Sequence, residues 1–93
     1  MQDDKEIIRR TLSGEKDAFE MIIRKYQSPI FNYIARAMGD YQTALEFTQD
    51  IFIKTYSSLS SYNPQYKFKT WLFKIASNYL IDYWRKKKLN TLS

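Results

Sequence analysis

The stretch from Phe68 to Lys88, FKTWLFKIASNYLIDYWRKKK, constrains the fold more than any other part of the chain. Wound as a helix with 3.6 residues per turn, it places its apolar side chains on one stripe. That stripe consists of Phe68, Leu72, Ile75, Ala76, Tyr79 and Tyr83. The other side carries cations, an amide, a hydroxyl and an indole, namely Lys67, Thr70, Trp71, Lys74, Asn78 and Arg85. One face is suited to a protein core and the other to a polar partner, although an amphipathic helix with a solvated basic face is the simpler interpretation of this stretch alone.

The positive charge of the chain is concentrated in this same segment. From Lys67 to Lys88 there are seven Lys or Arg residues and one acid, Asp82, so the segment carries +6 while the whole chain carries +5. Such an asymmetry favours a polyanionic partner, either nucleic acid or an anionic membrane surface.

The remaining residues predict an all-α fold, a compact bundle of about four helices in one domain spanning residues 1–93. Two Gly and two Pro leave little turn chemistry, which favours helices over hairpins. The helices are expected near residues 4–13, 17–38, 41–58 and 66–88, with Asp3 or Asp4, Asp17 and Asp40 as N-caps, Gly39 as a terminator and a kink at Pro29. The apolar side of the first helix is Ile7, Ile8 and Leu12. The predicted core comprises Phe19, Ile23, Ile34, Phe47, Ile51, Leu72, Ile75, Ala76 and Tyr79.

Most catalytic chemistry is absent from the sequence. The chain has no His and no Cys, which excludes Ser–His and Cys–His nucleophile systems and zinc sites with nitrogen or sulfur ligands. Its two glycines cannot form a Gly-rich phosphate loop. We therefore expect no enzyme, no cofactor and no metal. No apolar run approaches the length of a membrane span and the N-terminus is not a signal peptide, so a soluble cytoplasmic protein is predicted.

Aromatic residues interleaved with cations point to a binding surface instead. Tyr62, Tyr66, Trp71 and Trp84 lie in the Ser- and Pro-containing loop or off the apolar stripe, beside Lys67, Lys69, Lys74 and Arg85. Unpaired bases stack on such rings while cations neutralise the phosphates. Partial burial is the alternative for each ring taken singly.

Three ordered blocks of the sequence resemble region 2 of bacterial RNA polymerase sigma factors of the extracytoplasmic-function (group 4) type. They are GEKDAFEMIIRKYQSPIFNYI, ALEFTQDIFIKTYSSLSSYNP and FKTWLFKIASNYLIDYWRKKK. The last block is the most specific, because its TWL, IA, Asn, Asp and Arg positions are close to the family signature.

The resemblance implies a helical domain that binds the β′ coiled coil of RNA polymerase, recognises and melts the promoter minus-ten element, and holds the non-template strand. The implied polymerase-binding residues are Leu45, Glu46, Gln49, Asp50, Ile53 and Tyr56. The implied DNA-binding residues are Asn63, Gln65 and Tyr66 as walls of a pocket for a flipped base, together with Lys67, Lys69, Thr70, Trp71, Lys74, Asn78 and Arg85. An anti-sigma factor is a further candidate partner.

Two departures from the family pattern and one missing domain modify this expectation. The chain has Leu45-Glu46-Phe47 where many relatives carry an acidic pair before the hydrophobic residue, which alters the expected docking strength although Glu46 retains one acid. Leu72 stands where primary sigma factors carry the second of two tryptophans, which predicts weaker melting and a stricter need for a good promoter. The region 4 domain that reads the minus-35 element is absent, so an excised domain or truncated form is expected. Three alternatives stay open: a general nucleic-acid-binding module that uses its basic helix in a groove, a helix that lies on a membrane surface, and an adaptor that binds only protein.

Overall fold

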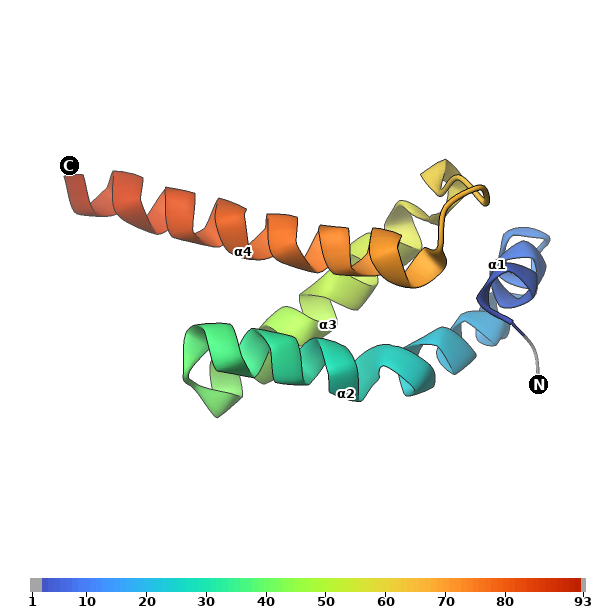
Figure 1. The fold of residues 1–93 in the computed structure, drawn as a ribbon, viewed down its shortest axis with the longest axis horizontal. Coiled ribbons are helices and arrows are strands. Elements are labelled where there is room, and N and C mark those ends of the chain that lie inside the picture. Colours follow the sequence, from blue (N-terminus) through green and yellow to red (C-terminus); the bar gives the residue numbers. More distant parts are fainter. Residues whose placement is uncertain (1–2, 93) are drawn as a thin grey trace.

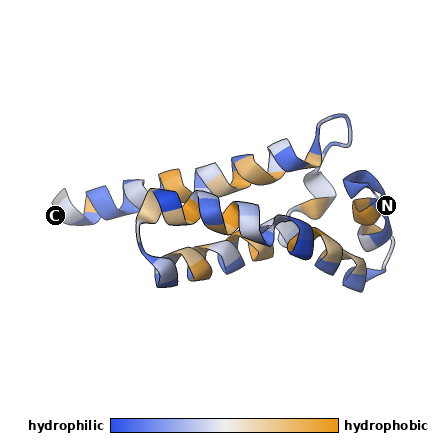
Figure 2. Ribbon diagram, turned by 60° about the horizontal axis from the view of Figure 1, so that its bottom comes forward, coloured by the Kyte–Doolittle hydropathy of each residue, from blue (hydrophilic) through white to orange (hydrophobic). Residues whose placement is uncertain are grey.

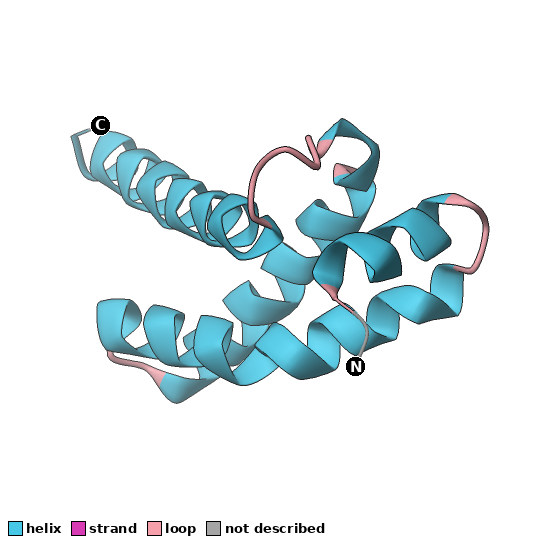
Figure 3. Ribbon diagram, turned by 45° about the vertical axis from the view of Figure 1, so that its right-hand side comes forward, coloured by secondary structure: helices cyan, strands magenta, loops and turns pink. Residues whose placement is uncertain are grey.

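The computed structural model describes residues 3–92, and every regular element in that range is helical. Four α-helices, α1 (Asp4–Leu12), α2 (Phe19–Met38), α3 (Tyr41–Ser57) and α4 (Phe68–Leu92), are joined by short connections that include two 3₁₀ turns, η1 (Lys16–Ala18) and η2 (Leu59–Ser61). The predicted all-α bundle of about four helices is confirmed, and only its boundaries move by a few residues (Figure 3).

The helices form an elongated bundle of 46 × 24 × 20 Å (Figure 1). Helices α2 and α3 make a hairpin, α4 packs against both, and α1 closes the end at which α2 begins. The last turns of α4 extend past the other helices at the C-terminal end of the molecule. These turns are mostly hydrophilic, whereas apolar segments gather where the helices meet (Figure 2).

Local chemistry sets most of the helix ends. The carboxylates of Asp3 and Asp40 accept the backbone N–H groups of Glu6 at 2.9 Å and Thr43 at 2.8 Å, so the caps predicted there are confirmed. Gly39 ends α2 in the left-handed region at φ 69°, as predicted, because a residue without a side chain adopts that conformation at little cost.

The cap predicted at Asp17 is wrong. Asp17 lies inside η1, and the N–H of Phe19 donates to backbone carbonyls of that turn. The chain is already wound helically when α2 begins, so no side-chain cap is needed there. Helix α2 then runs without interruption through Pro29.

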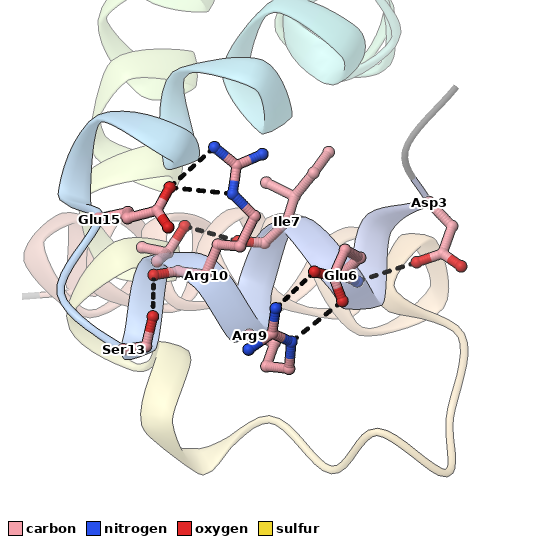
Figure 4. A network of polar contacts seen from close by, with 8 residues as sticks. Asp3, Glu6, Ile7, Arg9, Arg10, Ser13 and Glu15 are labelled. Carbon is pink, nitrogen blue, oxygen red and sulfur yellow. Dashed lines mark hydrogen bonds and ion pairs between the residues drawn. The ribbon is translucent and has the colours of Figure 1, made fainter.

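Helix α1 is held by short-range polar contacts (Figure 4). Arg9 pairs with Glu6 one turn earlier, and Arg10 reaches past the end of the helix to Glu15 at 2.8 Å. Its buried side consists of Ile7, Ile8 and Thr11, while Leu12, predicted to be buried, is 52% exposed. The hydroxyl of Thr11 donates to its own helix at the carbonyl of Ile7, which satisfies it inside the core.

The core is a single cluster drawn from every helix. Of the nine predicted core residues, five are buried (Phe19, Ile34, Ile51, Leu72 and Ala76) and four lie half-buried at its margin (Ile23, Phe47, Ile75 and Tyr79). Helix α4 buries Phe68, Leu72, Ala76 and Leu80, which follow one another at every fourth position. The stripe that α4 buries is thus narrower than the predicted one, and it extends to Leu80.

Candidate nucleic-acid interface

The connection between η2 and α4 is held by Tyr62. This residue was predicted to be an exposed binding aromatic, but it is 6% exposed and its hydroxyl donates to the backbone carbonyl of Tyr66. The prediction for Tyr62 is therefore wrong, because the ring fills the space beneath its own loop. The Asn63 side-chain oxygen accepts the backbone N–H of Gln65 at 3.0 Å, which tightens the same turn.

A cluster of four aromatic rings supports this loop from below. Tyr62 lies 5.4 Å from Phe68 and 5.2 Å from Trp71 between ring centroids, and Phe68 lies 6.0 Å from Tyr26 of α2. Edge-to-face and tilted contacts at these distances are favourable beyond the area that they bury. The cluster joins the loop, the first turn of α4 and the middle of α2 into one unit. Trp71 is consequently half-buried, with part of its indole accessible.

The residues predicted to line a base pocket are exposed at the top of this cluster. Asn63, Gln65, Tyr66 and Lys67 all lie at the surface, and Tyr66 is 65% exposed. The Asn63 amide nitrogen and the whole Gln65 side chain have no hydrogen bond within the described residues. The loop is thus anchored through Tyr62 while its amide donors and the phenol of Tyr66 face outward.

The cationic stripe continues along α4. Lys67, Trp71, Lys74, Asn78 and Arg85 recur at helical spacing on the side away from the buried stripe, and all except Trp71 are exposed. Thr70, also exposed, lies at the edge of this stripe. Arg85 pairs with Asp82 at 3.8 Å, and both side chains are largely exposed, so the pair holds the guanidinium weakly.

Lys69 does not join this stripe. It lies with Lys67, Phe68 and Tyr26 around a hollow of about 400 Å³ whose opposite wall is Asp3, Asp4 and Lys5 at the start of α1. The sequence placed Lys69 with the other cations because it is close to them along the chain. Around the helix axis it points to the acidic N-terminal end of α1 instead.

A second surface is formed by α2 and α3. Leu45, Gln49, Ile53 and Tyr56, four of the six residues expected to bind polymerase, border two adjacent hollows of about 180 and 540 Å³. Ile53 is 64% and Tyr56 40% exposed. The remaining walls were missed by the sequence interpretation and comprise Phe19, Ile23, Gln27, Ser28, Phe31, Tyr41, Thr48, Phe52 and Ser57. The sequence offered one signal for an apolar surface here. Ile53 is an apolar residue off the predicted buried side of its helix, and it lies one turn before the aromatic Tyr56.

The two predicted acidic residues of this set turn toward α4. The Tyr79 hydroxyl donates to Asp50 at 2.6 Å, and the Tyr79 ring packs edge-on against Phe47 with centroids 5.0 Å apart. Burial and the carboxylates of Asp50 and Glu46 raise the pKa of Tyr79 above its ordinary value. The structure therefore divides the predicted polymerase site into an apolar groove beside Gln49 and an acidic ridge beside α4.

Within residues 3–92, no three or more acidic side chains gather as metal ligands would. No helix of this part is both long and apolar enough to cross a bilayer.

A family model describes this arrangement. Residues 22–89 match the sigma-70 region 2 model, which covers α3, the loop that follows it, and nearly all of α2 and α4. The chain therefore belongs to the sigma-70 region 2 family. Sigma factors are transcription initiation factors and not enzymes, and this membership agrees with the expectation from the sequence.

Its relatives are extracytoplasmic-function sigma factors. The chain is 37% identical over 84 residues to the ECF RNA polymerase sigma factor SigW of Bacillus subtilis, which covers 90% of this chain and 45% of SigW. It is 36% identical over 77 residues to the sigma-H factor of Pseudomonas aeruginosa, covering 83% of this chain and 40% of that protein. The chain thus spans less than half the length of these two relatives.

A solved structure shares the fold. An engineered region 2 of sigmaE, determined by NMR in complex with GTAAAA, superposes with a TM-score of 0.84 at 28% identity. The superposition covers 94% of this chain and 90% of that chain. The resemblance drawn from the three sequence blocks is confirmed.

Proposed function

We propose that this chain recognises a promoter minus-ten element as unpaired DNA and binds RNA polymerase through the hairpin of α2 and α3. The observation that carries the proposal is the exposed loop of Asn63, Gln65 and Tyr66, which is continuous with the cationic face of α4. This surface provides amide donors, aromatic faces and cations side by side, which is the set that single-stranded nucleic acid requires.

Each group on this surface has a distinct role. An unstacked base enters against the loop, where Gln65 and Tyr66 contact its edge and face. Trp71, held by Tyr62 and Phe68, supplies a fixed ring for the neighbouring base. Asn78 reads a base edge, since an amide offers a donor and an acceptor together. Lys67, Lys74 and Arg85 neutralise phosphates, whereas Lys69 lies off this path beside the start of α1.

The similar engineered sigmaE region 2 supports the choice of ligand, because it was solved in complex with GTAAAA. A general groove-binding helix requires only the cations of α4. It gives no reason for a loop that is braced by four packed rings and exposes Gln65 and Tyr66.

The polymerase surface is proposed to be the groove between α2 and α3. Its apolar walls accept side chains from the β′ coiled coil, and Gln49, shared by both hollows, supplies a hydrogen bond. Glu46 and Asp50 add negative charge along one rim, which orients a basic partner more than it tightens binding.

The DNA half is tested by binding single-stranded non-template minus-ten oligonucleotides and their duplexes by fluorescence anisotropy. We expect tighter binding to the matching single strand, because a duplex must first lose pairing and stacking. Trp71→Ala should weaken binding by about 1–3 kcal/mol. Asn78→Ala should reduce discrimination among sequences more than it reduces affinity for a random strand.

Gln42→Ala is the matched control, since it removes an exposed amide from α3, away from the proposed path. Urea unfolding of Trp71→Ala separates lost binding from a weakened aromatic cluster. Tighter binding to duplex, with Trp71→Ala and Asn78→Ala both silent, would favour the groove-binding alternative.

A further inference from the structure

A hollow between α2 and α4 is not used by the surfaces described so far. It has a volume of about 490 Å³ and is lined by Pro29, Asn32, Tyr33, Arg36, Ala37 and Phe73. This volume lies in the range of pockets that hold small organic groups, about 300–1,000 Å³. Five of the six residues belong to one face of α2, and Phe73 closes the hollow from α4.

Two walls of the hollow are aromatic rings and a third is a proline. Tyr33 packs edge-on against Phe73 with ring centroids 5.7 Å apart and an interplanar angle of 70°, yet it remains 36% exposed. Pro29 is exposed one turn before Tyr33 and adds a side chain without rotational freedom. The exposed amide of Asn32 stands at the rim. Because the two rings meet edge to face and Tyr33 is partly exposed, part of an aromatic face remains accessible to a flat ligand such as a base.

The charge of the hollow is positive. Arg36 is exposed and lies one turn after Asn32 and Tyr33 on α2. Within residues 3–92 no carboxylate pairs with Arg36, and none lines the hollow. An anionic ligand with a flat apolar portion matches the combination of an arginine and two aromatic rings, because arginine contacts phosphate while aromatic faces stack on bases.

The hollow lies beside the proposed DNA path around the axis of α4. In a helix of 3.6 residues per turn, Thr70 and Ser77 lie between Lys74 and Phe73 around the axis of α4. A strand leaving the face of Lys74 and Asn78 would cross these two hydroxyl groups before it reached the hollow. Trp84, 46% exposed, lies on the Phe73 side of α4 further along the helix.

We propose that this hollow is a second base-binding site for single-stranded DNA. An unstacked base packs against Tyr33 and Phe73, and Arg36 contacts the adjacent phosphate. Stacking is tolerant of sequence, so the site extends the length of strand that is held without adding to the sequence that is read. This proposal rests on the proposed function and adds a second position to the same path.

The test compares non-template minus-ten oligonucleotides of minimal length with versions extended by several nucleotides at either end. The wild-type domain should bind one extended version about fivefold or more tightly than the minimal strand, as expected for one additional stacked base. Tyr33→Ala and Arg36→Gln should each remove this gain and leave binding of the minimal strand unchanged. Tyr33→Phe, which keeps the ring, should retain the gain.

The chain offers matched controls. Tyr41→Ala removes an exposed tyrosine that packs on Phe31 with nearly the same geometry, at 5.3 Å and 69°, beside the other groove. Arg24→Gln removes an exposed arginine from α2 that pairs with Glu20. Both variants should keep the gain from extension, and urea unfolding of every variant checks its fold.

The outcomes separate the two proposals. The proposed function stands if minimal strands bind and Trp71→Ala weakens that binding. The second site is nevertheless overturned if extending the strand does not increase affinity, or if the increase persists in Tyr33→Ala and Arg36→Gln. Oligo(dT) of the same lengths covers the opposite case. If the wild-type domain shows no sequence-specific binding, the proposed function is refuted. The second site then stands only if Tyr33→Ala and Arg36→Gln bind long oligo(dT) more weakly than the wild-type domain does. Backbone amide chemical shifts of residues 30–37 on addition of the extended strand report the contact directly.

Discussion

Tyr79 links the two proposed surfaces through one hydroxyl group. It projects from α4, donates to Asp50 of α3 and packs its ring on Phe47. A rotation of α4 that displaces this ring would break the hydrogen bond. The orientation of α4, the proposed DNA-binding helix, is therefore tied to the acidic ridge beside the proposed polymerase groove.

Removing this hydroxyl should weaken the fold without changing the packing. Tyr79→Phe is expected to lower the free energy of unfolding by about 1 kcal/mol, the typical net value of one hydrogen bond. Tyr83→Phe is the matched control, because Tyr83 packs on the same Phe47 ring at 5.0 Å and its hydroxyl has no hydrogen bond within residues 3–92. Urea unfolding at pH 7 measures both. Equal losses in the two variants would mean that the hydroxyl bond to Asp50 contributes nothing.

The pH dependence of the same bond has a definite sign. The folded state raises the pKa of Tyr79, so the neutral phenol is favoured there and its contribution is complete below the unfolded value of about 10. The difference in stability between wild type and Tyr79→Phe should hold from pH 7 to about pH 9 and shrink above pH 10.

Among the elements, α3 depends on its first residues for its start. The carboxylate of Asp40 accepts both the backbone N–H and the hydroxyl of Thr43. These bonds hold the pKa of Asp40 below its ordinary value. The turn at Gly39 and Asp40 joins α2 to α3, the two helices that form the proposed polymerase groove.

Asp40→Ala should lower the free energy of unfolding at pH 7, while Asp40→Asn, which keeps an accepting oxygen, should change it less. A folded pKa below the unfolded value of about 3.9 places this stabilisation above that value, and it is lost as the pH falls through the folded pKa. The difference between wild type and Asp40→Asn should thus narrow in urea titrations repeated near pH 3. A difference that persists unchanged at pH 3 would exclude the carboxylate charge as its source.

How far the sequence predicted each element depended on how local its causes are. The caps at Asp3 and Asp40 and the end at Gly39 involve residues within one turn of each other, and they were predictable. The burial of Tyr62 was not, because it depends on Phe68, Trp71 and the opening of the next helix. Lys69 follows a related pattern. It lies beside the start of α1 because of how the helices pack, and α1 is distant in the sequence.

The sequence did not predict the groove walls contributed by α2, because they too depend on contacts between segments that are distant in the sequence. Ile23 and Gln27 join Gln49 and Ile53 only because two helices pack side by side, and periodicity along one helix does not specify its neighbour. The acidic residues show the converse. Asp50 fits the pattern of a docking residue in the sequence, while in the structure its carboxylate already accepts a hydrogen bond from the Tyr79 hydroxyl.

For the whole molecule, the polymerase proposal predicts that the groove contributes more to binding than the acidic ridge. Gln49→Ala and Ile53→Ser should each weaken binding to a β′ coiled-coil fragment by about fivefold or more, as central interface residues do. Asp50→Lys should also weaken it, in a manner that diminishes with salt. Calorimetric titration at two ionic strengths measures these effects.

Tyr79→Phe distinguishes two explanations for Asp50. It removes the same hydrogen bond between α3 and α4 but keeps the carboxylate. If it weakens binding to the fragment as much as Asp50→Lys does, then Asp50 acts through the position of α4 and does not contact polymerase. Unchanged affinity in Gln49→Ala and Ile53→Ser would remove the groove from the interface.

The projecting end of α4 has a consequence for the speed of encounter. The four consecutive cations from Arg85 to Lys88 are exposed beyond Tyr83, whose ring makes the last aromatic contact of α4 with the bundle among residues 3–92. Charges placed away from the body of a protein attract a polyanion over about one Debye length, near 10 Å at 0.1 M salt. These four cations would accelerate the association of the domain with DNA, and the acceleration would diminish as the ionic strength rises. The residence time of DNA would instead depend on the stacked rings and amides near the loop. The C-terminal end of α4 would thus govern the association rate and its N-terminal end the dissociation rate.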